Sequence, residues 1–152
     1  MPISNKFQDR ITDLVEDCEE NKSTLPKLIG IDYRSLSNAL NYGIVPSPRI
    51  LIRIADYFNV SIKYLLGTSA DVYFMKAPTK SNFKTRFELL CNENKVSHYK
   101  VSKDLHFENS YITHWIQNNY LPSLEFIELI SDYFKVSIDY LLGRTDDRKL
   151  YE

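Results

Sequence analysis

The stretch DYFNVSIKYLLG (56–67) occurs a second time as DYFKVSIDYLLG (132–143), 76 positions later and without a gap. A repeat at a fixed period indicates that one structural unit is present twice. In a chain of 152 residues, this period predicts two small domains of roughly 65 residues each. We expect the first domain at 1–69, a linker at 70–82 and the second domain at 83–152.

Apolar residues recur at three- and four-residue spacings in the first copy, which is the pattern of amphipathic helices. Ser23 and Asp32 are expected to cap the second and third helices, and Gly30 to end the second. The second copy repeats this plan, with Ser97 as a cap. The first copy should therefore form helices at 7–20, in a short segment ending at Gly30, and at 33–40, 49–58 and 61–67.

The distribution of charge differs along the chain, although the net charge is only -1. That balance weighs against nucleic-acid binding, because proteins that bind nucleic acids are usually basic overall. Acidic residues crowd between Asp9 and Glu20, whereas the stretch from Lys22 to Arg49 has Asp32 as its single acid. The first copy is thus electrostatically polarised.

Several classes of protein find no support in the sequence. It shows no signal core or membrane-length apolar run, so we expect a cytoplasmic protein that does not contact the membrane. Cys18 and Cys91 lack the spacing of a disulfide framework or zinc site. His98, His106 and His114 recur every eight residues, but no carboxylate or thiol completes a metal set. No phosphate loop, nucleophile-base pair or carboxylate dyad stands out, so we expect neither an enzyme nor a cofactor.

Two short helices joined by a tight turn, in a five-helix unit that ends in VSxxYLLG, resemble the helix-turn-helix domain of the Cro/cI-like (XRE-type) phage repressors. The resemblance covers nearly all of both copies, and in the second it runs from Leu90 through Ser123 to Gly143 without insertion. It implies an all-α protein with two tandem five-helix lambda-repressor-like helix-turn-helix domains. The usual glutamine at the start of the second helix is absent from both copies, and His106 replaces the usual glycine of the turn.

The resemblance also implies how each copy would meet DNA. In this family the third helix presents its N-terminal residues to base edges in the major groove, and the second helix crosses the phosphate backbone. Arginine can fork to guanine and asparagine to adenine, which are the commonest specific pairings. The implied base-reading residues are Tyr33, Arg34 and Asn38 in the first copy and Asn109, Ser110 and His114 in the second; the implied backbone contacts are Lys22, Asn41, His98 and Gln117.

These features lead to one preferred function and one alternative. We expect a sequence-specific DNA-binding transcriptional regulator, a repressor of phage or mobile-element type, whose partner is double-stranded DNA. Since such repressors dimerise to meet two half-sites about 34 Å apart, the chain could form a homodimer or act as an intramolecular pseudo-dimer. The alternative is a protein-binding module on the same fold, such as an antitoxin, an anti-repressor or an anti-CRISPR-like inhibitor. The acidic balance, the missing glutamines and the aromatic content of 13% favour it.

Overall fold

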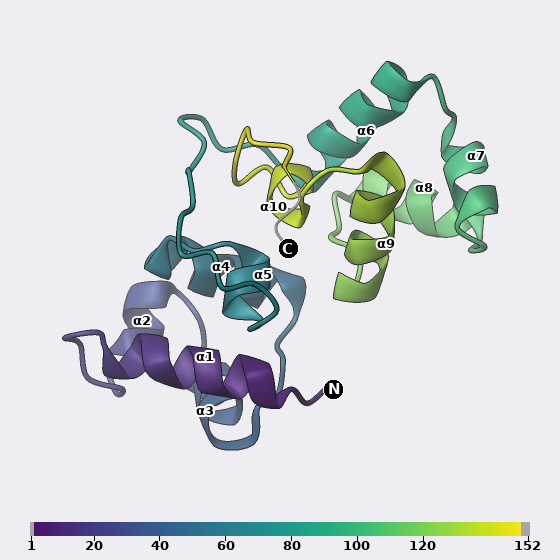
Figure 1. Cartoon of the computed structure of the whole chain (residues 1–152). Coiled ribbons are helices and arrows are strands. Elements are labelled where there is room, and N and C mark those ends of the chain that lie inside the picture. Colours follow the sequence, from purple (N-terminus) through teal and green to yellow (C-terminus); the bar gives the residue numbers. More distant parts are fainter. Residues whose placement is uncertain (1, 150–152) are drawn as a thin grey trace. The chain divides into compact units, whose positions relative to one another are not determined.

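Helices account for the regular secondary structure of the computed structural model, which describes residues 2–149 (Figure 1). Within these residues, β pairing is limited to an isolated bridge between Ile3 and Ile44. The all-α class expected from the sequence is therefore confirmed. The helices are α1 (Asn5–Glu16), α2 (Leu25–Ile29), α3 (Tyr33–Tyr42), α4 (Pro48–Phe58), α5 (Ile62–Leu65), α6 (Phe83–Asn94), α7 (His98–Asp104), α8 (Asn109–Asn118), α9 (Leu124–Phe134) and α10 (Ile138–Leu141).

The chain divides into two compact units, and the division falls between Phe74 and Met75. Unit 1 contains α1 to α5, and unit 2 contains α6 to α10. Residues 75–82, which we expected to belong to a linker, are part of unit 2. The Ala77 N–H donates to the Arg144 carbonyl and the Ser81 N–H to the Gly143 carbonyl, both at 3.0 Å.

The last three helices of each unit begin and end at equivalent positions of the repeat: α3 with α8, α4 with α9, and α5 with α10. Equivalent serines fix the closing helices, because the Ser61 hydroxyl accepts the Tyr64 N–H at 3.0 Å and the Ser137 hydroxyl accepts the Tyr140 N–H at 2.9 Å. Each such cap satisfies an N–H that has no acceptor within its helix. The repeated VSxxYLLG motif therefore encodes both the start and the end of this helix.

The start of α2 differs from the sequence expectation, and the cap assigned to Ser23 is wrong. The Asn21 side chain accepts the N–H groups of Ser23 and Thr24, both at 3.0 Å, and the Ser23 hydroxyl itself donates to Asn21. Thr24 is the N-cap residue of α2 and its side chain makes no capping hydrogen bond, so the bonds to Asn21 belong to the turn that precedes the helix. The first helix also ends earlier than expected, at Glu16 instead of residue 20.

A buried or half-buried arginine ties the first helix of each unit to the segment after the closing helix. Arg10 Nη1 donates to the carbonyls of Tyr64 (2.7 Å) and Ser69 (3.2 Å). Arg86, at the equivalent position of α6, donates to the carbonyls of Tyr140 (3.1 Å) and Thr145 (3.0 Å). The Tyr64 and Tyr140 carbonyls also accept the N–H groups of Gly67 and Gly143, both at 3.0 Å, so each arginine adds a second donor at the closing helix and joins it to the segment that follows.

Candidate nucleic-acid interface

A tight turn joins α2 to α3 in unit 1. Gly30 adopts a left-handed conformation (φ 89°), and the N–H groups of Gly30 and Ile31 both donate to the Pro26 carbonyl, at 2.8 and 2.9 Å. Asp32 then caps α3 by accepting the Ser35 N–H at 3.1 Å, as the sequence predicted. The Gly30 and Ile31 N–H groups are therefore bonded to the end of α2, whereas the Gly30 carbonyl accepts Nη1 of Arg53 from α4.

Unit 2 forms the same turn between α7 and α8 without a glycine. His106 occupies the position of Gly30 and is also left-handed, with φ 61°. The Phe107 N–H donates to the Ser102 carbonyl at 3.0 Å, which matches the bond from Ile31 to Pro26. Histidine adopts this conformation more often than most residues with a side chain, although at a cost that glycine avoids.

The residues expected to read bases in unit 1 all belong to α3. Tyr33 and Arg34 occupy the first turn and are exposed, and Asn38 is half-buried one turn further on. Arg34 and Asn38 are four residues apart, so they share one face of the helix. No hydrogen bond or ion pair within residues 2–149 engages the Arg34 guanidinium. Arg34 is thus available to an external acceptor.

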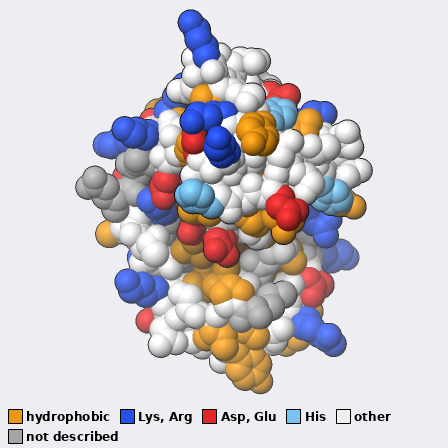
Figure 2. All heavy atoms as spheres, turned by 90° about the vertical axis from the view of Figure 1, so that its right-hand side faces the viewer, with side chains coloured by type: hydrophobic (Ala, Val, Ile, Leu, Met, Phe, Trp, Pro, Cys, Tyr) orange, Lys and Arg blue, Asp and Glu red, His pale blue; other side chains and the backbone are white. Residues whose placement is uncertain are grey.

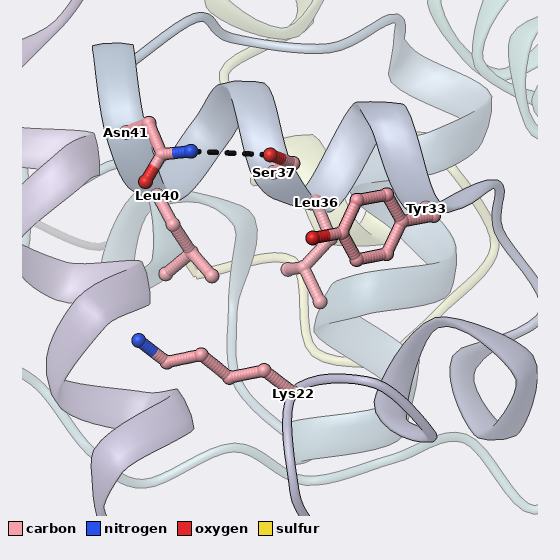
Figure 3. A pocket seen from close by; sticks show the side chains of 6 residues that line it. All are labelled: Lys22, Tyr33, Leu36, Ser37, Leu40 and Asn41. Carbon is pink, nitrogen blue, oxygen red and sulfur yellow. Dashed lines mark hydrogen bonds between the residues drawn. The ribbon is translucent and has the colours of Figure 1, made fainter.

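A small pocket of about 70 Å³ lies beside α3 and includes Lys22, Tyr33 and Asn41 (Figure 3). Figure 3 shows the Lys22 side chain reaching from the segment before α2 towards the part of α3 that carries Leu40 and Asn41. The Asn41 amide donates to the Ser37 hydroxyl at 3.1 Å. At this volume the pocket has room for about two water molecules, so it is far smaller than an ordinary substrate site. Both backbone residues expected in unit 1 meet here, whereas Arg34 and Asn38 do not line it.

Asp32 is the acid nearest to this group of residues in the sequence. The hydrogen bond from the Ser35 side chain, which lies 2.6 Å from Asp32 Oδ1, lowers the pKa of the Asp32 carboxyl, and the Arg34 charge lowers it further. The carboxylate therefore stays ionised while it caps α3. Its negative charge therefore lies at the start of the helix that carries Arg34.

The equivalent residues of unit 2 are exposed or half-buried, but several have internal partners. The Ser110 hydroxyl donates to Glu108 at 3.3 Å, and the Asn118 amide donates to Nδ1 of His114 at 3.0 Å. The His114 ring also packs edge-on against Tyr120, with 4.8 Å between ring centroids. Asn109 and Gln117 are exposed on the same helix.

Two acidic residues that the sequence did not single out bond to side chains of α7: Glu88 from α6, and Asp104, the last residue of α7 itself. Nε2 of His98, the expected backbone contact, donates to the Glu88 carboxylate. Asp104 accepts from Lys100 at 3.0 Å and from the Tyr133 hydroxyl at 2.6 Å. Hydrogen bonds from Tyr133 and Lys100 lower the pKa of the Asp104 carboxyl. The four-residue spacing of Lys100 and Asp104 was a usable signal, whereas the contact between Glu88 and His98 depends on how α6 packs against α7.

Charged side chains of both signs are mixed on the face drawn in Figure 2, where lysine, arginine, acidic and histidine side chains alternate. An extended area of one sign is absent from this view. This face therefore differs from the broad basic stripe typical of many nucleic-acid-binding domains. On this face, any attraction for phosphate has to come from a few local cations.

A metal-binding or membrane-spanning role gains no support from residues 2–149. They contain no group of three histidine, cysteine, aspartate or glutamate side chains that could hold an ion. No helix in this part of the chain is long and apolar enough to cross a bilayer. Burial raises the pKa of the Cys91 thiol to about 12, so it is not a reactive thiolate.

Comparison with known proteins found no matching family model, no matching curated protein and no matching solved structure.

Proposed function

We propose that the chain is a sequence-specific DNA-binding transcriptional regulator with two helix-turn-helix domains of the Cro/cI-like type. In this proposal α2 and α3 form the helix-turn-helix of unit 1, and α7 and α8 form that of unit 2. The observation that carries the proposal is the surface of α3 in unit 1. There an unpaired, exposed Arg34 lies on the first turn, and Lys22 and Asn41 meet beside the same helix.

The chemistry of this surface suits a duplex. When α3 enters the major groove, Arg34 can donate two hydrogen bonds to the O6 and N7 atoms of guanine, and Asn38 can pair with adenine. Each such pair discriminates against the wrong base by about 1 to 3 kcal/mol. Lys22 and Asn41 would contact phosphate oxygens, which fixes the position of α3 but carries no sequence information.

The proposal is tested by the affinity for a fluorescein-labelled duplex of random sequence, measured by anisotropy over a range of salt concentrations. Each neutralised phosphate contributes a slope of about -0.9 to log K against log salt, so contacts from Lys22 and neighbouring donors should give a clearly negative slope. A flat slope, or no binding at low salt, would contradict the proposal.

A protein-binding module is the second candidate, and a specific observation on unit 2 favours it. Tyr99, Tyr111 and Tyr120 are 63%, 46% and 57% exposed. Tyrosine is enriched in protein interfaces because it combines a large apolar ring with a polar hydroxyl. Absence of DNA binding together with a stable complex of defined stoichiometry would support this candidate.

A further inference from the structure

The DNA-facing surfaces expected of the two units differ in their acidic residues. Glu88 and Asp104 of unit 2 correspond in the repeat to Thr12 and Leu28 of unit 1. The residues they contact, His98 and Lys100, correspond to Lys22 and Thr24. The duplication has therefore produced one surface with an unpaired lysine and another with carboxylates bonded to His98 and Lys100.

Glu88 acts on the position that should contact phosphate. It lies on α6, and its carboxylate accepts from Nε2 of His98, the first residue of α7. Both side chains are only partly exposed, at 35% for His98 and 42% for Glu88. The His98 ring also packs against Phe87, with 5.4 Å between centroids, which limits its freedom to turn towards another partner. A phosphate approaching His98 would find its Nε2 donor already bonded to Glu88. It would also be repelled by the negative charge of the Glu88 carboxylate.

Asp104 acts in the same way on Lys100 of the same helix, α7. Its carboxylate holds the Lys100 ammonium and is itself fixed by the Tyr133 hydroxyl from α9. The Asp104 side chain is less exposed, at 30%, than the Lys100 side chain, at 58%. A surface ion pair alone contributes little stability. However, the Asp104 carboxylate also accepts from the Tyr133 hydroxyl. Its negative charge therefore stays in place at the end of α7 when Lys100 moves.

Unit 1 lacks both restraints. Lys22 has no ion-pair partner within residues 2–149, and the uncharged Thr12 and Leu28 stand where unit 2 has Glu88 and Asp104. The acids near this surface are Asp32, which caps α3, and the residues at the end of α1.

We infer that unit 1 alone contacts DNA, and that Glu88 and Asp104 exclude phosphate from the α7–α8 surface of unit 2. This inference rests on the proposed function and specifies which unit performs it. One chain then supplies one reading helix, and unit 2 is left to other contacts. Neutralising the two carboxylates should convert unit 2 into a second phosphate-binding surface.

The test uses the full chain and the labelled random duplex, with the salt slope as its readout. Lys22→Ala should make the slope shallower by about 0.9, the contribution of one phosphate. The double variant His98→Ala, Lys100→Ala should leave the slope unchanged. The double variant Glu88→Gln, Asp104→Asn should make the slope more negative by about 0.9 to 1.8, the contribution of one to two phosphate contacts. The double variant Glu125→Gln, Asp132→Asn, which removes two exposed acids of α9 in the same unit, controls for the change in net charge.

Melting temperature and far-UV circular dichroism of each variant establish that it is folded. A shallower slope for the His98 and Lys100 double variant would overturn the inference and leave the proposed function standing. A slope for Glu88→Gln, Asp104→Asn equal to that of Glu125→Gln, Asp132→Asn would overturn the role of the two carboxylates. A flat slope for the unaltered chain would instead remove the proposed function, and the inference with it.

Discussion

The Arg86 guanidinium lies over the Tyr140 ring, 4.1 Å from its centroid, while it donates to the Tyr140 backbone carbonyl. Arg10 and Tyr64 repeat this arrangement in unit 1, with 3.7 Å between guanidinium and ring centroid. The tyrosine of the VSxxYLLG motif is thus a stacking partner for an arginine in both units. A planar guanidinium can stack on a ring and donate in its own plane at the same time, which lysine cannot do.

Removing this arginine should destabilise its own unit. Arg86→Ala is expected to lower the unfolding free energy of unit 2 by roughly 2 to 3 kcal/mol, because buried carbonyls lose a charged donor. Trp115, the single tryptophan of the chain, lies in unit 2, so its fluorescence during urea unfolding reports that unit. Arg10→Ala should leave this transition in place and shift the signal from circular dichroism alone. Arg34→Ala, at an exposed site, is the matched control, and an equal effect of Arg34→Ala and Arg86→Ala would contradict the expectation.

The turns of the two units should change stability in opposite directions when the left-handed residue is replaced: His106→Gly should stabilise unit 2, and Gly30→Ala should destabilise unit 1. His106→Gly removes a side chain from a left-handed conformation and should stabilise unit 2 by about 0.5 to 1 kcal/mol after the extra entropy of the unfolded glycine is counted. Gly30→Ala introduces that strain into unit 1 and should cost about 1 to 2 kcal/mol. Its added methyl group has space, since the nearest atom, Arg53 Nη1, is 3.7 Å away. A loss of stability in His106→Gly would show that the imidazole makes a stabilising contact.

Tyr133 should titrate at a higher pH than an ordinary tyrosine side chain. Its hydrogen bond to Asp104 raises the pKa of the Tyr133 hydroxyl to about 12. Because the pKa is raised on folding, the stabilisation is complete below the ordinary tyrosine pKa near 10 and is lost as the pH rises through about 12. The absorbance of tyrosinate at high pH, compared between the unaltered chain and Tyr133→Phe, isolates this group. Asp104→Asn should return the titration of Tyr133 to the ordinary range. A difference in absorbance between the unaltered chain and Tyr133→Phe that is centred near pH 10 would contradict the hydrogen bond between Tyr133 and Asp104.

The two thiols should differ in their reaction with a disulfide reagent. Cys91 is buried and its pKa is raised to about 12, whereas Cys18 is half-buried. Since the thiolate is the reactive form, one thiol of each folded chain should react quickly with the reagent, and the second should react only after denaturation. Cys18→Ser should abolish the rapid phase. Two rapid equivalents in the folded protein would contradict the burial of Cys91.

Arg34 should determine sequence preference more than overall affinity. Arg34→Lys keeps the charge but loses the rigid fork, so discrimination against the wrong base should fall by about 1 to 3 kcal/mol while binding to random duplex changes little. A preferred site selected from a random pool supplies the specific ligand for both proteins. An unchanged preference in Arg34→Lys would remove this side chain from base recognition.

Much of the fold could be predicted from the sequence because it depends on local chemistry repeated twice. The caps at Asp32 and Ser97 follow from side chains that bond within their own turn. The cap at Ser23 was expected because serine is a good cap, but the N-cap of α2 is Thr24, and Asn21 accepts the N–H groups of the turn before it. The early end of α1 at Glu16 was missed for a related reason, because helical periodicity continues into residues that leave the helix.

The sequence by itself determined the duplication, the helical class and the residues that line one face of α3, since each depends on spacing along the chain. Only the tertiary structure decided which charges are available on that face. The contact of Glu88 with His98 and that of Asp104 with Tyr133 join residues on different helices, and such pairs are fixed by packing instead of by sequence spacing. Two copies of one sequence pattern thereby acquired different surfaces on the same scaffold.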